Sequence, residues 1–195
     1  AITAIRNLPF IDFRAYKEGV NIPVAMQPSA PLEYSYIMSK DGEEHVFDQY
    51  PSDESYEFVD MKLKNEDALP KISDFAVWNE EGDFTDEILS RNKVVILVTY
   101  LSKIGTSHLE EIDDLVNGLK NSNLETVFVA ASSEEEISKF LAQRGWEMDS
   151  YQADATVVKT IMRSNPGIML LKEGVVLKKY HFRNTPKAET VIELF

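Results

Sequence analysis

The sequence predicts a mixed α/β fold for the C-terminal part of the chain, and three observations lead to that prediction. Val94–Tyr100 and Leu124–Ala131 are nearly continuous apolar runs rich in β-branched residues, typical of strands buried on both faces. A stretch with helical spacing follows each run, so the two strands should lie parallel. Lys172-Glu173-Gly174 separates Gly167–Leu171 from Val175–Tyr180, which indicates an antiparallel hairpin.

Capping signals predict where the helices between these strands begin and end. Ser107 stands three residues before Glu110, and Ser133 three residues before Glu136, which is the spacing of a capping box. Gly145 is placed to end the second helix. We also expect shorter elements: a strand at Phe75–Trp78, a turn at 80–83, a helix at Asp86–Arg91 capped by Thr85, a strand at Tyr151–Ala153, and helices at Thr156–Arg163 and from Pro186 to Leu194.

The N-terminal third has a different character. Residues 1–31 contain four prolines and no helical pattern, so we expect an irregular arm, pinned to a neighbouring surface by Phe10, Phe13 and Tyr16. Residues 32–70 predict a small antiparallel β subdomain, with strands at Leu32–Met38, Glu44–Phe47 and Tyr56–Leu63 and a turn at Asp41-Gly42. The predicted organisation is therefore an arm (1–31), a β subdomain (32–70) and an α/β domain (71–195).

Composition excludes several classes of function. The 195 residues include 33 acidic and 20 basic side chains, a net charge of −13, which argues against binding to nucleic acid. There is no cysteine, so disulfides, thiolate nucleophiles and thiolate metal ligands are all excluded. His45, His108 and His181 lack the spacing of a zinc site, and we expect neither a metal nor a cofactor.

We expect no direct insertion of this chain into a membrane. Its longest apolar run, Val94–Val98, is far shorter than the ~20 residues of a membrane helix. Ala1–Phe10 does not resemble a signal peptide, because Arg6 and Pro9 interrupt any apolar stretch.

The order of elements from residue 72 resembles that of thioredoxins, in their redoxin branch. Asn165-Pro166-Gly167, followed by Ile168–Gly174, resembles the cis-proline strand and the turn of that family. The resemblance implies a thioredoxin-like mixed sheet with flanking helices and a cis bond before Pro166. Aligned from Ile96, the two cysteines of the family would fall on Gly105 and His108, so the thiol chemistry does not carry over.

Most of the chain also resembles the soluble part of DoxX-type membrane proteins of Bacteroidetes. Residues 6–23 look like the segment after their last membrane helix, and Lys159–Gly167 looks like a later segment of the same group. The resemblance implies a soluble domain tethered to the bacterial inner membrane, on a side that the sequence does not assign. Its partner would then be its own N-terminal membrane module, which is associated with quinone-linked electron transfer, or another protein or peptide.

Two loops are the candidate site. Gly105, Thr106, Ser107 and His108 form the degenerate active-site loop, and Asn165, Pro166 and Gly167 form the cis-proline loop. The resemblance implies that Pro166 borders a peptide-binding groove, to which Asn165 would offer backbone groups. His108 stands where a helix begins after a central strand, which is a preferred ligand position in α/β folds.

Three functional interpretations follow. We expect a non-catalytic module that binds or positions a partner beside a membrane redox module. The alternative is an enzyme that runs a non-thiol reaction in the same groove with His108 as the base, although the sequence shows no polar companion for it. A third interpretation is a purely structural unit, with His108 an exposed residue of a first helical turn and Pro166 a residue that fixes its loop.

Overall fold

The computed structural model describes residues 14–195. They divide into two compact units, which we call the main unit (residues 14–23 and 74–195) and the small unit (residues 24–73). Along the chain the small unit is thus an insertion within the main unit. The boundaries fall at 23/24 and 73/74, whereas the sequence places them at 31/32 and 70/71. Phe10 and Phe13 lie outside the described residues.

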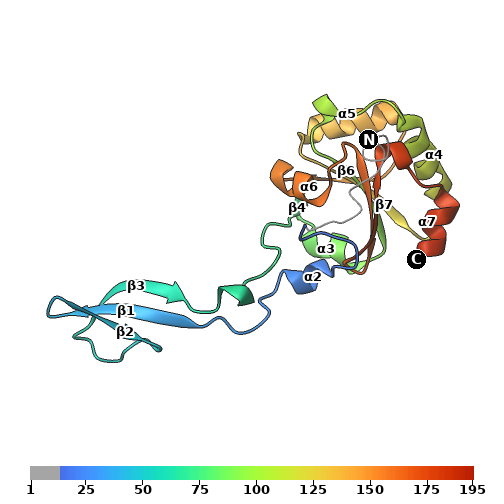
Figure 1. Cartoon of the computed structure of the whole chain (residues 1–195). Coiled ribbons are helices and arrows are strands. Elements are labelled where there is room, and N and C mark those ends of the chain that lie inside the picture. Colours follow the sequence, from blue (N-terminus) through green and yellow to red (C-terminus); the bar gives the residue numbers. More distant parts are fainter. Residues whose placement is uncertain (1–13) are drawn as a thin grey trace, which may run out of the picture. The chain divides into compact units, whose positions relative to one another are not determined.

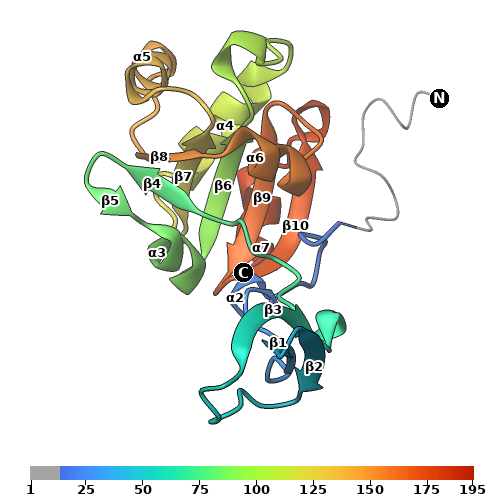
Figure 2. The same ribbon diagram turned by 90° about the vertical axis from the view of Figure 1, so that its left-hand side faces the viewer.

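A seven-stranded sheet forms the centre of the main unit, in the order β10-β9-β6-β7-β8-β4-β5 (Figure 2). β6, β7 and β8 are mutually parallel, and the remaining pairs are antiparallel. The strands are β4 (Val77–Asn79), β5 (Gly82–Asp83), β6 (Lys93–Val98), β7 (Glu125–Ala130), β8 (Asp149–Ala153), β9 (Gly167–Lys172) and β10 (Val175–His181). The predicted α/β class, with two parallel crossovers and a hairpin, is confirmed.

Helices cover both faces of this sheet (Figure 1). Those of the main unit are α3 (Thr85–Ser90), α4 (Leu109–Leu119), α5 (Glu134–Arg144), α6 (Ala155–Ile161) and α7 (Ala188–Leu194), with 3-10 turns η2 (Leu101–Lys103) and η3 (Phe182–Asn184). Helices α4, α5 and α7 share one hydrophobic cluster with alternate residues of β6, Val94, Ile96 and Val98. The order strand, loop, helix, strand, helix, cis-proline hairpin and final helix makes this a thioredoxin-like fold.

The burial of β6 explains why helices cover both faces of the main sheet. All six of its residues are buried, so it needs packing partners on each side.

Helices α4 and α7 approach closely at Gly118, where an added Cβ would lie 2.5 Å from the Cβ of Ala188. A larger residue at Gly118 would therefore push α7 away from α4.

Two of the predicted helix caps are wrong. Helix α4 begins after His108, which has a left-handed backbone (φ 70°), so Ser107 lies one residue too early to cap it. Helix α3 begins at Thr85 itself. The Asp83 carboxylate accepts from the Thr85 N–H (2.8 Å), and the Thr85 hydroxyl accepts from the Val77 N–H (3.1 Å).

The other capping predictions are confirmed. Ser133 and Glu136 form a reciprocal capping box at the start of α5, and Gly145 ends the helix in the left-handed conformation (φ 67°). The helix predicted from Thr156 begins one residue earlier, at Ala155, where the Asp154 carboxylate accepts from the N–H groups of Thr156 and Val157. The final helix begins at Ala188, after Pro186, rather than at the proline.

The segment before the small unit covers one edge of the main sheet. Gly19 N–H donates to the Val176 carbonyl (2.8 Å), Val176 N–H donates to Val20, and Ile22 N–H donates to Gly174 (2.9 Å each). Tyr16 is fully buried, and its hydroxyl donates to Asp74 (3.0 Å). The predicted pinning by Tyr16 is therefore seen, on the main unit itself.

The small unit is built on a three-stranded antiparallel sheet in the order β2-β1-β3. Its strands are β1 (Tyr34–Lys40), β2 (Glu43–Phe47) and β3 (Glu57–Leu63), and η1 (Glu66–Ala68) follows them. Asp41 and Gly42 both have positive φ, as the predicted hairpin turn requires. A short helix, α2 (Ile22–Ala25), spans the boundary between the units.

Candidate functional site

The structure brings the two predicted loops together. The degenerate active-site loop follows β6, and the cis-proline loop precedes β9, which pairs with β6. The Gly105 N–H donates to the Asn165 carbonyl (2.8 Å), and the Asn165–Pro166 bond is cis, as the resemblance implies. The juxtaposition follows from the strand order, since neighbouring strands present their loops at the same end of the sheet.

The side chain of Asn165 joins the two loops. Its Oδ1 accepts from the Thr99 N–H (2.8 Å), while its Nδ2 donates to the carbonyls of Tyr100 (3.1 Å) and Lys103 (2.8 Å). Three hydrogen bonds from one amide therefore fix the chain between β6 and α4. The backbone carbonyl that a groove would offer to a peptide is already bonded to Gly105.

Phe182 fills the space beside Gly105. An added Cβ at Gly105 would lie 2.9 Å from the Phe182 ring, and Phe182 is itself buried. The Phe182 N–H donates to the Ser164 hydroxyl (3.1 Å), and Ser164 in turn bonds to the Pro166 carbonyl. The position where the resemblance places the family's first cysteine thus packs against an aromatic ring, which any side chain there would have to displace.

His108 has a polar companion that the sequence did not indicate. Its Nδ1 lies 2.7 Å from a carboxylate oxygen of Glu111, and this hydrogen bond holds the pKa of Glu111 below its usual value. The two side chains are 44% and 51% exposed, so the pair is solvated. A surface pair of this kind stabilises the first turn of α4 and lacks the enclosure that tunes a catalytic base.

Burial divides the predicted site residues into two groups. Thr106, Ser107 and His108 are exposed, whereas Pro166 and Gly167 are buried. A Cβ on Gly167 would lie 2.2 Å from Cγ of Met162, so this glycine permits close packing under the loop. The accessible part of the site is therefore the turn before α4.

Two lysines flank this end of the sheet, and sequence analysis missed them. The Lys103 and Lys159 ammonium groups lie 5.5 Å and 5.1 Å from the centroid of the Tyr100 ring. Lys159 belongs to α6, more than fifty residues beyond Tyr100, so only the fold shows that they meet. Two ammonium groups therefore lie over one ring at this end of the main unit, while Glu110 and Glu111 follow the exposed turn in the first turn of α4.

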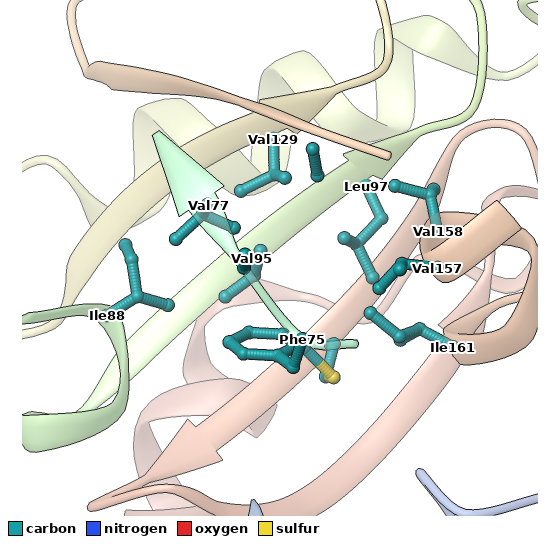
Figure 3. A pocket seen from close by; sticks show the side chains of 12 residues that line it. Phe75, Val77, Ile88, Val95, Leu97, Val129, Val157, Val158 and Ile161 are labelled. Atoms are coloured by element: carbon teal, nitrogen blue, oxygen red, sulfur yellow. The ribbon is translucent and has the colours of Figure 1, made fainter. Parts of the chain in front are cut away.

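A cavity in the main unit is a packing gap and not a ligand site. It lies between the sheet and the α3 and α6 helices, with Phe75, Val95, Leu97, Val157 and Ile161 pointing into it (Figure 3). Its volume is about 10 Å³, room for one water-sized sphere, and its wall is apolar. Such a space stays dry and offers no polar group to orient a ligand.

Residues 14–195 contain no group of three or more acidic or histidine side chains placed to hold a metal ion. Within the same residues, no helix combines the length and the apolar character needed to cross a bilayer.

Comparison with known proteins gives matches to parts of this chain. A family described as a domain of unknown function (DUF8463) matches residues 32–66, which include all three strands of the small unit. No curated protein matches the chain.

Several solved structures that match the chain are redoxin-type proteins. A protein of Neisseria meningitidis assigned as a thioredoxin is 20% identical, with a TM-score of 0.45 over 62% of this chain and 83% of that one. A thiol peroxidase of Chromobacterium violaceum is 12% identical, with a TM-score of 0.45 over 63% and 82%. A peroxiredoxin-like protein of Aquifex aeolicus is 10% identical, with a TM-score of 0.41 over 86% and 87%. The fold assignment rests on the strand order and connections described above.

Proposed function

We propose that this chain is a redox-inactive, thioredoxin-like domain that binds and positions a partner protein. The observation that carries the proposal is the state of the two loops. They keep the family's arrangement and are held rigid by Asn165, yet thiol chemistry is absent and Thr106, Ser107 and His108 stay exposed. A rigid, exposed turn loses little conformational entropy when a partner binds.

The proposed mode of binding uses side chains more than the Asn165 backbone groups that the resemblance implies. Because the Asn165 carbonyl is bonded to Gly105, the partner would contact the exposed turn and the lysines over Tyr100 through side chains. The two ammonium groups over Tyr100 favour contact with an acidic or polar group of the partner. By the DoxX-type resemblance, that partner is the protein's own membrane module at the bacterial inner membrane.

A site-specific crosslinking experiment tests the binding role. A photo-crosslinking residue replaces Ser107 in the protein expressed from its own gene, and a matched variant carries it at Asn121, which is exposed just beyond the other end of α4. We expect a discrete crosslink to a membrane-embedded polypeptide from position 107 and none from position 121. Equal crosslinking from both positions, or none from either, would refute a binding role for this turn.

The gene sequence upstream of Ala1 tests the membrane partner separately. Four apolar segments of membrane length would support tethering, and the charges of their loops would assign the side of the membrane. Without such segments the membrane module is removed from the proposal, while the crosslinking result still decides whether the turn binds another protein.

The second candidate is an enzyme with His108 as a general base, and the contact with Glu111 favours it. A carboxylate in this position holds an imidazole in one orientation. A His108→Gln variant separates the two functions. If His108 only contacts the partner, the variant should weaken the crosslink from Ser107; a crosslink of unchanged yield together with loss of a chemical change in the crosslinked partner would favour catalysis.

A further inference from the structure

We propose that the outer edge of β3 in the small unit is a docking site for an extended, basic segment of a partner protein, which adds to the sheet as a fourth strand. This surface shares no residue with the loops before α4 and β9. The inference therefore stands or falls independently of the function proposed above.

The first step is that β3 is an open edge. It is the last strand in the order β2-β1-β3, and six of its seven residues are exposed. The opposite edge strand, β2, is shorter, and the Tyr56 ring packs on His45 (5.5 Å) and Phe47 (5.0 Å). An unpaired row of backbone N–H and carbonyl groups is a template for strand addition.

The second step is that β3 exposes apolar side chains along this edge. Phe58 is 54% exposed, and Val59 and Met61 are 46% exposed each. Opposite them on β1, Met38 pairs with Phe58 and is buried. A fourth strand would cover the apolar side chains that β1 leaves open, so main-chain pairing and apolar burial would act together.

The third step is charge. Residues 24–73 contain 11 acidic and 4 basic side chains, a formal charge of −7, against −6 for all the rest of the chain. On β3 itself, the Asp60 carboxylate accepts from the Met61 N–H (2.8 Å), which keeps a negative charge against the backbone. Glu57 adds a second negative charge and Lys62 one positive charge, so β3 itself has a formal charge of −1. These charges favour a partner strand that carries lysine or arginine.

The same charges disfavour a second copy of this chain as the occupant. Antiparallel self-pairing centred on Asp60 places the two Asp60 carboxylates opposite each other, and any register joins two units of charge −7. The observations therefore point to a basic segment of a different protein.

Peptide titration of the full chain tests the proposal. The probe is a ten-residue peptide that alternates lysine and valine, and its control alternates glutamate and valine. We expect the basic peptide to bind at least about tenfold more tightly and to protect the outward-facing amides of β3 from hydrogen exchange. Protection elsewhere, or equal binding of both peptides, would overturn the proposal.

Two matched double variants distinguish docking on β3 from general attraction to an acidic protein. Glu57→Lys with Asp60→Lys reverses the charge of β3, and Glu43→Lys with Glu44→Lys makes the same change on β2. We expect the β3 variant to weaken binding of the basic peptide about tenfold and the β2 variant to have less effect. Equal weakening by both, or sedimentation of the unmodified chain as a dimer that loses its β3 amide exchange, would refute the inference.

Discussion

The two sheets of this protein differ in whether another segment pairs with their edge strands. In the main unit, residues 19–22 pair with the outer side of β10, and the buried side chains of Tyr16 and Ile22 hold them there. In the small unit, β3 has no neighbouring strand on its outer side within residues 14–195, and its apolar side chains are about half exposed.

The difference shows how one chain combines a closed scaffold with an open edge. The main sheet is covered on both faces and at the start of β10, and its other edge strand, β5, has only two residues, so it offers few backbone groups to other chains. The small sheet has an open edge at β3. The negative charge of residues 24–73 disfavours pairing of this edge with the same edge of a second copy. The main sheet supports loops of fixed structure, and the small sheet offers an edge to which a partner strand could bind reversibly.

The largest expected effect tests the covered edge. Ile22→Ala removes a fully buried side chain from the segment on β10 and should lower the free energy of unfolding of the main unit by about 2–5 kcal/mol. The matched variant is Val59→Ala on β3, where the change should stay within about 0.5 kcal/mol. Chemical denaturation measures both, and similar losses for the two variants would contradict the contrast between the edges.

A smaller effect is expected at the loops that the covered sheet supports. Asn165→Ala leaves the Thr99 N–H and two carbonyls without their partner and should cost about 1–3 kcal/mol. Asn165→Asp keeps the acceptor for Thr99 but turns a carboxylate oxygen toward two carbonyls, so its loss should be greater. Thermal unfolding ranks the variants; an Asp variant as stable as the unmodified chain would show that the amide does not join the loops.

The smallest expected effect concerns the small unit at low pH. Hydrogen bonds from Ser55, with a further one from Lys40, lower the pKa of Asp53 from 3.8 to about 2. A lowered carboxyl pKa contributes stability above the unfolded value, and that contribution disappears as the pH falls from about 4 through about 2. Carboxyl NMR titration should give a midpoint near 2 for Asp53, whereas a midpoint near 4 would show that these hydrogen bonds do not form.

Local patterns were enough to predict most of the fold. Short-range preferences that the tertiary structure keeps are seen in three places. They are the buried apolar run of β6, the helical spacing of apolar residues in α4 and the turn at Asp41-Gly42. The cap predicted at Ser107 failed because the chain enters α4 through a left-handed His108, which the spacing of serine and glutamate does not reveal.

The position of the candidate site in the chain could be predicted, but the contacts of its side chains could not. Resemblance to thioredoxins placed the loops at Gly105–His108 and Asn165–Gly167, and the structure brings them together. The bonds of the Asn165 amide, the packing of Phe182 on Gly105 and the lysines over Tyr100 join residues tens of positions apart. Long-range contacts of this kind leave no periodic signal in a single sequence.

Hydrogen exchange followed by NMR, residue by residue, tests the contrast between the two edges most directly. We predict that the amides of Gly19, Ile22 and Val176 are protected, since each donates across the covered edge of the main sheet. In β3, the amides that face β1 should be protected, and the outward amides should exchange freely, except that of Met61, which donates to Asp60. Rapid exchange at Val176, or uniform protection along β3 in the free protein, would contradict a covered main sheet and an open small one.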